Sequence, residues 1–233
     1  MKFDYAEMNC YSPEGKPGQL ERAQTASELG STCLALKNNN AGVIIAHNPL
    51  RSKLAEPSKK IFEIEPSTLF AFAGITNDGL CMVDYLENKH LYETVERNRK
   101  MHPVQVFEDF TYGMSYSSLV GDSRLCGASG ILLTEFEDKI VLVESKPNKT
   151  AKEVYGCAIG SRNYSCKTVL EDDLENFIDP NCTSEELIQI GLKAMKNAHP
   201  ENDEVNVLKP EDLEIFLIEI GKPHQKINPT EVL

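Results

Sequence analysis

Short apolar runs separated by polar turns dominate the first third of the chain. Residues 31–37 and 42–47 are apolar over several consecutive positions, which is typical of strands buried on both faces. The asparagine-rich turn at 38–41 predicts that they pair as a hairpin. Residues 61–64 and 69–73 repeat the pattern on either side of a proline-containing turn, so a second hairpin is expected.

A short amphipathic helix is predicted over residues 19–29, just before these strands. Leu20, Ala23 and Ser27 fall on one face at helical spacing, and Gly30 ends the pattern. A helix this short is marginal by itself in water. Its apolar face is small rather than bulky, which suits close packing on its own domain or on a neighbouring chain.

Two longer helices are expected after the second hairpin. Gly74 ends that hairpin, and Thr76, Asn77 or Asp78 is predicted to cap the first of the two helices. The second helix is predicted to begin at Pro103, because proline is favoured in the first turn of a helix.

The second half of the chain also contains strands and helices in runs. Thr183 precedes Glu186 by three residues, the spacing of a capping box, and Gly191 in the same helix is expected to allow close packing. Strands and helices that come in runs, rather than alternating singly, predict the α+β class with antiparallel sheets covered by helices. Without a repeat or a linker, residues 1–233 are interpreted as a single domain. The predicted elements are a hairpin of residues 131–133 and 140–143 around Glu137-Asp138, a strand at 154–159, helices at 163–177 and 183–197, and strands at 205–208 and 213–220.

The composition is that of an acidic folded protein. Of 233 residues, 41% are hydrophobic and 26% charged, and the formal net charge is −12. An acidic surface argues against nucleic acid as the main partner, because phosphate contacts require a basic face. The seven cysteines are odd in number and form no CxxC pair, which indicates reduced thiols. Residues 1–10 contain acids and no apolar run, so no export signal is expected, and no apolar run is long enough to span a bilayer.

Few residues form a pattern with a recognisable chemistry. The five histidines show no metal-ligand spacing, and no glycine-rich phosphate loop occurs, so neither a metal nor a cofactor is expected. The acidic run at 171–173 is interpreted as a solvated helix face.

Several motifs occur in order along the chain. They are Tyr11-Ser12-Pro13-Glu14-Gly15-Lys16, Gln19-Leu20-Glu21-Arg22-Ala23, Gly30-Ser31-Thr32, Ala73-Gly74-Ile75-Thr76-Asn77-Asp78 and Gly191-Leu192-Lys193-Ala194-Met195. Together these motifs resemble those of the alpha-type subunits of the 20S proteasome, and residues 159–171 are most similar to the alpha subunit at position six of the eukaryotic ring. The resemblance implies the family's four-layer sandwich of helices, sheet, sheet and helices, which is the N-terminal-nucleophile hydrolase fold. It also implies a gate tail and an alpha-specific helix in residues 1–30 and a sandwich core in residues 31–233.

The resemblance also implies a function. Alpha subunits form seven-membered rings that cap the catalytic beta rings, gate substrate entry and dock activators in ubiquitin-dependent protein degradation. The chain is therefore expected to be a non-catalytic structural subunit without a cofactor. Its expected partners are neighbouring alpha and beta subunits and the C-terminal tails of a regulatory particle or another activator, with no nucleic acid and no membrane. The expected location is the cytoplasm and the nucleus.

An activator-tail pocket is implied by position. Lys60 matches the family's pocket lysine, which is expected to pair with the terminal carboxylate of an activator. Gly30 lines the same pocket, and Glu21 lies close to it. The simpler alternative is that Lys60 is a solvated lysine and that Gly30 only ends a helix.

A gate cluster is implied in the same way. Phe3, Asp4, Pro13 and Arg22 occupy the positions of the tyrosine, aspartate, proline and tyrosine that hold the gate open in the family. Both tyrosine hydroxyls are missing, so this gate is not held by the family's hydrogen bonds. We hypothesise that Arg22 pairs with an acid, with Asp4 of the same or a neighbouring chain as the candidate.

Two other functions stay open. Ser31 falls on the nucleophile position of the catalytic relatives, so a peptidase matured by cleavage after Gly30 is one alternative. Against it, Ser31 has no free amine, and the catalytic aspartate position falls on or near Asn48, although Lys60 matches the lysine of the catalytic subunits. The other alternative is a free scaffold protein with the same fold, which would not co-purify with beta subunits.

Overall fold

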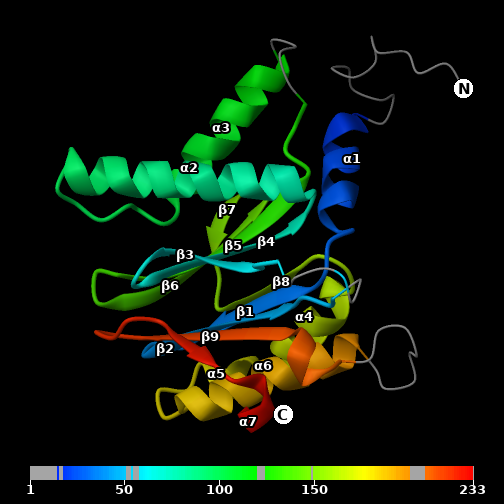
Figure 1. Ribbon diagram of the computed structural model, residues 1–233, viewed down its shortest axis with the longest axis vertical. Helices are drawn as coiled ribbons and strands as arrows, with labels where there is room; N and C mark the ends of the chain where they lie inside the picture. The colour runs from blue at the N-terminus through cyan, green and yellow to red at the C-terminus, as the bar shows by residue number, and fades with distance from the viewer. Residues whose placement is uncertain are drawn as a thin grey trace, which may run out of the picture.

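The chain folds around two five-stranded antiparallel sheets that lie face to face, with helices on the outer side of each (Figure 1). This arrangement is seen in a computed structural model. It confirms the predicted α+β class and the four-layer order of helices, sheet, sheet and helices. The residues that it describes are 15, 18–50, 54, 58–119, 124–147, 149–199 and 208–232.

The first sheet has the strand order β10-β9-β2-β1-β8. The predicted hairpin of β1 and β2 is confirmed, and Asn38 fixes its turn. The Oδ1 atom of Asn38 accepts hydrogen bonds from the backbone N–H groups of Asn40 and Ala41 at 2.9 and 2.7 Å. The strands are β1 (Cys33–Lys37), β2 (Ala41–His47), β8 (Gly156–Ile159), β9 (Leu213–Glu219) and β10 (Gln225–Ile227).

The second sheet has the strand order β3-β4-β5-β6-β7. Its two predicted hairpins, β3–β4 and β5–β6, are confirmed. The strand predicted at 154–159 is confirmed as β8 of the other sheet, but β7, which precedes it in this sheet, was not predicted. β7 carries two lysines and a glutamate, so it lacks the apolar pattern on which the prediction relied. The strands are β3 (Ile61–Glu65), β4 (Thr68–Gly74), β5 (Ala128–Phe136), β6 (Lys139–Lys146) and β7 (Lys149–Glu153).

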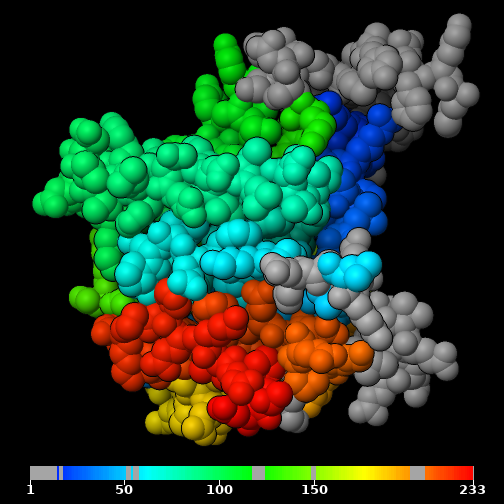
Figure 2. All heavy atoms as spheres, viewed as in Figure 1, coloured from blue at the N-terminus to red at the C-terminus, as the bar shows by residue number. Residues whose placement is uncertain are grey.

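Helices cover the outer face of each sheet. α2 (Thr76–Val95) lies across β3, β4 and β5, and α3 (Gln105–Leu119) packs beside it. α4 (Asn163–Asp172) and α6 (Ser184–Ala198) cover the first sheet. In the space-filling view (Figure 2), the β3–β4 hairpin fills the band between α2 and the orange and red C-terminal segments. The remaining helices are α1 (Gly18–Ser27), α5 (Leu174–Phe177), η2 (Pro210–Asp212) and α7 (Pro229–Val232).

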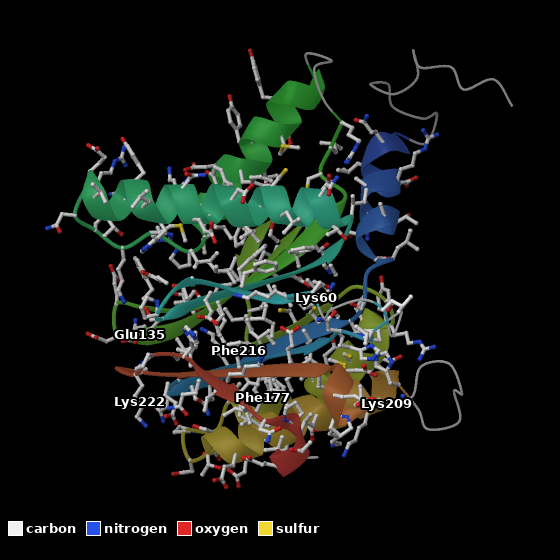
Figure 3. All side chains as sticks on the ribbon, viewed as in Figure 1. Lys60, Glu135, Phe177, Lys209, Phe216 and Lys222 are labelled. Atoms are coloured by element: carbon white, nitrogen blue, oxygen red, sulfur yellow. The ribbon has the colours of Figure 1, made fainter. Side chains whose placement is uncertain are left out.

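Three apolar layers alternate with the two sheets. Phe216 belongs to the layer between the sheets, and Phe177 belongs to the layer between the first sheet and its helices (Figure 3). Phe70 and Phe107 belong to the layer between the second sheet and its helices. The predicted close packing at Gly191 is confirmed, but against a sheet: a Cβ atom there would lie 2.7 Å from Ile45 Cδ1.

The helix ends test the capping predictions. The capping box is confirmed, because the Thr183 side chain accepts from the Glu186 backbone N–H and the Glu186 side chain accepts from that of Thr183. The cap predicted among residues 76–78 is wrong: Ile75 precedes the first turn without a side-chain cap. Asp78 instead accepts hydrogen bonds from Arg124 and from the Gly127 backbone.

Other boundaries differ in smaller ways. The helix predicted at 163–177 is interrupted at Asp173, which separates α4 from α5. The helix predicted to begin at Pro103 begins at Gln105. Of the strand predicted at 205–208, only Leu208 lies within the described residues, and it is not in a strand. Among the helices of the described ranges, none combines the length and the apolar character needed to cross a bilayer.

Candidate functional site

The helix α1 packs by its small face on the end of the second sheet, next to β4 and β5 (Figure 1). Ala23 and Ser27 are buried there, whereas Glu21 and Arg22 are exposed. The Ser129 hydroxyl donates a hydrogen bond of 3.0 Å to the Ser27 hydroxyl. The predicted small face is thus what allows the helix backbone to approach the sheet closely.

Gly30 lies in the closest part of this contact. A Cβ atom on Gly30 would lie 2.3 Å from the Gly74 backbone nitrogen, a separation that real Cβ atoms do not show. The Gly30 carbonyl also accepts a hydrogen bond of 2.7 Å from the Ser161 backbone N–H. Gly30 does not have a positive φ. It is therefore required for the close backbone approach, and the alternative that it only ends a helix is incomplete.

Lys60 immediately precedes β3 and lies on the same side of the molecule as α1 (Figure 3). Its Nζ atom lies 5.5 Å from the centroid of the Phe72 ring. Such a cation–π contact contributes about 0.5–1 kcal/mol at an exposed site. Phe72 is followed in β4 by Ala73 and Gly74, the residues that face Gly30. Lys60 and Gly30 therefore converge on the same end of β4.

A carboxylate that the sequence analysis missed holds the backbone at Lys60. Glu214 Oε2 accepts from the backbone N–H groups of Lys60 and Ile61 at 3.4 and 3.3 Å. Its other oxygen accepts from the Asn48 side-chain amide at 2.7 Å. Glu214 lies opposite Ala46 in the β2–β9 pairing, which brings it to the end of β2. Asn48, on or near which the resemblance places the catalytic aspartate, thus carries an amide that donates to a carboxylate from another strand.

Ser31 and Thr32 follow Gly30 at the start of β1. The Thr32 hydroxyl donates to the Ser161 carbonyl at 2.7 Å, which uses its only proton. His199 Nε2 lies 3.3 Å from the hydroxyl oxygen of Thr32, and it must therefore be the donor in that contact. A nucleophile needs a base that accepts its proton. This threonine and histidine have the opposite hydrogen-bond direction, so they do not form an activated pair.

Two buried groups next to this end of the sheets are held neutral. Burial lowers the pKa of His47 to about 4, and the His199 ring, whose centroid is 4.3 Å away, contributes to the shift. Burial also raises the pKa of the Cys33 thiol to about 11, although Lys60 opposes this shift. At neutral pH the imidazole is therefore unprotonated and the thiol is protonated, so Cys33 does not act as a nucleophile.

The structure locates some of the predicted site residues and not others. It brings Lys60 and Gly30 to one strand end, and it places Glu21 on the exposed side of α1. Whether these three residues bind an activator tail stays a prediction. In the gate cluster, Arg22 is exposed on α1, but the other members, Phe3, Asp4 and Pro13, lie outside the described residues, so the pairing of Arg22 with Asp4 stays a hypothesis.

The family model and the similar proteins found by comparison point to the same protein family. The sequence model of the proteasome subunit family matches residues 27–215. The chain is 25% identical to proteasome subunit alpha type-1 of Dictyostelium discoideum, over 97% of this chain and 90% of the relative. It is 27% identical to proteasome subunit alpha type-6 of Saccharomyces cerevisiae, over 81% and 80% of the two chains. It is also 25% identical to proteasome subunit alpha of Methanosphaerula palustris, over 90% of this chain and 86% of the relative.

Proposed function

The chain belongs to the proteasome subunit family, and from this premise we propose that it is a non-catalytic structural subunit of the 20S alpha ring. The observation that carries the proposal is the family match through nearly the whole sandwich, together with the alpha-subunit names of the relatives reported above. The packing of α1 on the sheet through Gly30 supports the same assignment, because it integrates the segment before residue 31 into the fold.

The absence of peptidase activity is supported by the surroundings of Ser31. Its nitrogen forms a peptide bond with Gly30, whose carbonyl accepts the Ser161 N–H. An N-terminal nucleophile needs a free α-amine as its base, and this amine forms only if that bond is cleaved. The Asn48 amide is not a carboxylate and already donates to Glu214. The family's catalytic chemistry therefore lacks both its amine and its acid.

The finer parts of the proposal concern the partners. The chain would assemble with neighbouring alpha subunits and with beta subunits, in the cytoplasm and the nucleus. Residues 1–30 would contribute to the gate, and Lys60 would bind the carboxylate of an activator tail. The yeast relative is named alpha type-6 and the Dictyostelium relative alpha type-1, so the ring position suggested by residues 159–171 stays a proposal.

Native mass spectrometry of the endogenous complex, with subunit ejection, tests the proposal. A ring particle that ejects this chain at its full 26.0 kDa supports a subunit with a retained N-terminal segment. A chain that begins at Ser31 would instead establish the self-processed peptidase. If the chain were found only as a free monomer, the scaffold alternative would replace the ring subunit.

The pocket is tested separately, by the affinity of the assembled particle for a peptide with an activator's C-terminal tail. Lys60→Ala should weaken binding about tenfold or more, because a charge-assisted hydrogen bond contributes about 1.5–3 kcal/mol. The neighbouring Lys59 is exposed and provides the matched control, since Lys59→Ala keeps the pocket lysine. Equal affinities for the two variants would remove Lys60 from the pocket.

A further inference from the structure

Three charged side chains meet at one edge of the sandwich. Glu144 and Lys146 lie near the end of β6, and Lys167 lies on α4 above the other sheet. The Nζ atoms of Lys146 and Lys167 are 3.1 and 3.2 Å from the same oxygen, Glu144 Oε1. Glu144 and Lys146 share the face of β6 that carries Ile140 and Leu142 into the layer between the sheets. The cluster thus closes the sandwich edge next to β7 and β8.

The cluster has a surplus of positive charge in a poorly solvated position. The side chains of Lys146, Lys167 and Glu144 are only 19%, 25% and 16% exposed. Cys157 lies beside them, but burial raises its pKa, so the thiol supplies no second negative charge. Two ammonium groups that share one carboxylate oxygen repel each other, and this repulsion is stronger at a partly buried site than in water.

The two lysines respond to this repulsion differently. Burial lowers the pKa of Lys146, and the hydrogen bond from Lys167 adds to the shift, since an amine accepts a hydrogen bond only when it is neutral. Burial acts to lower the pKa of Lys167 as well, but its hydrogen bond to Lys146 and its attraction to Glu144 outweigh this effect and raise it. Lys167 therefore keeps its proton, and Lys146 is the amine that gives up its proton more readily.

We propose that Lys146 is a nucleophilic lysine and a site of acylation by acyl thioesters. The lone pair of its Nζ attacks the thioester carbonyl carbon, so that a C–N bond forms and the C–S bond breaks. The thiolate leaves and takes up the proton that the nitrogen loses, which yields an amide and a thiol. A lysine beside another cation in a desolvated position is a known form of activated amine. Acylation gives up the contact of Lys146 with Glu144, but it removes the surplus charge and leaves Glu144 and Lys167 as a matched pair.

The test compares two lysines of one strand in the complete chain. Lys139 lies exposed at the other end of β6 and serves as the internal control. The chain is incubated with acetyl-coenzyme A at pH 7.5, and the acetylation rate at each lysine is followed by mass spectrometry. When the pKa of an amine falls by one unit, the neutral fraction at pH 7.5 rises about tenfold. The less basic amine is also a weaker nucleophile, which lowers its rate constant by about half a logarithmic unit. Lys146 should therefore react about threefold faster than Lys139 for each such unit. An equal or lower rate at Lys146 would overturn the proposal.

Two further measurements separate activation from simple exposure. Lys167→Gln should slow acetylation of Lys146 toward the rate of Lys139 without reaching it, because the repelling charge is gone while the burial of Lys146 remains. Lys193→Gln, which alters an exposed ion pair with Asp173, should leave the rate unchanged. If Lys167→Gln does not fold, the pH profile of the unaltered chain decides: the rate at Lys146 should level off at a lower pH than at Lys139. Coincident profiles would refute the activation of Lys146.

Discussion

The buried His47 is expected to make the stability of the chain fall in mild acid. Its side chain lies at the end of β2 and is only 3% exposed. Burial is the main cause of its lowered pKa, followed by the neighbouring His199 ring; Arg162 and Lys60 lower it further, and Asp212 opposes them. The folded chain thus binds this proton less tightly than the unfolded chain does, so its contribution to stability is complete above the unfolded pKa and is lost as the pH falls.

The size of the effect follows from the two pKa values. A histidine with a pKa of 6.5 in the unfolded chain and about 4 in the folded chain gives a limiting loss of about 3 kcal/mol, reached below pH 4. At pH 5 the same values give a loss of about 2 kcal/mol. That loss is a large part of the stability of an ordinary domain, which is about 5–15 kcal/mol. The decline should be concentrated between pH 6.5 and 4.

Urea denaturation of the full chain at pH 7.5 and pH 5.0 provides the assay. His47→Leu removes the titrating group, so the free energy of unfolding should fall by about 2 kcal/mol less in this variant than in the unaltered chain. Ile44→Val on the same strand serves as the control, because it destabilises by about 1 kcal/mol without changing a charge. Its pH-dependent loss should equal that of the unaltered chain. Equal losses in the His47 variant and the unaltered chain would refute the argument.

Three substitutions, with Gly113→Ala as a control for the first, test the local geometry, each by its denaturation midpoint in urea. Gly30→Ala should destabilise the chain by about 1–3 kcal/mol, because its Cβ atom would meet the Gly74 backbone. Gly113→Ala, on an open face of α3, should stabilise the chain by up to about 1 kcal/mol. A Gly30→Ala variant as stable as the unaltered chain would contradict the close contact. Thr183→Ala should cost about 1 kcal/mol through loss of the capping box, and an unchanged midpoint would show that the cap contributes nothing. Asp138→Gly should stabilise by about 0.5–1 kcal/mol, because Asp138 has a φ of 58°, and a destabilised variant would rule out strain as the cause.

The strands were predictable where their apolar pattern was continuous. The strands β1, β2, β4, β5 and β6 each contain a run that is buried on both faces, so each contains consecutive apolar residues. β7 was missed because it is a mostly polar strand at the edge of its sheet, so it lacks the continuous apolar run of the other strands. The cap predicted at Asp78 failed for another reason, since Arg124 and Gly127 bind that carboxylate from a distant segment. Local propensity does not include such tertiary partners.

The candidate site was predictable only through its local motifs. Lys60 and Gly30 were identified by their positions, but Glu214, which fixes the backbone at Lys60, is about 150 residues away in the sequence. The alternation of β9 assigns Glu214 to one face of the strand, but it does not say which strand lies beside it. The β2–β9 pairing is what makes the contact, and pairing partners are the part of a sheet that a single sequence specifies least.

One structural cause connects the retained N-terminal segment with the lack of an activated nucleophile. Conversion into a peptidase would need cleavage between Gly30 and Ser31, but that bond is packed against Gly74 and its carbonyl is hydrogen-bonded to Ser161. The same close contact docks α1 on the sheet. Beside it, Thr32 already donates its proton to a carbonyl, so its hydroxyl does not replace the missing amine-activated one. Loosening the contact to release Ser31 would therefore also detach α1. Both the packing of Gly30 on Gly74 and the hydrogen bond to its carbonyl thus stabilise the intact chain.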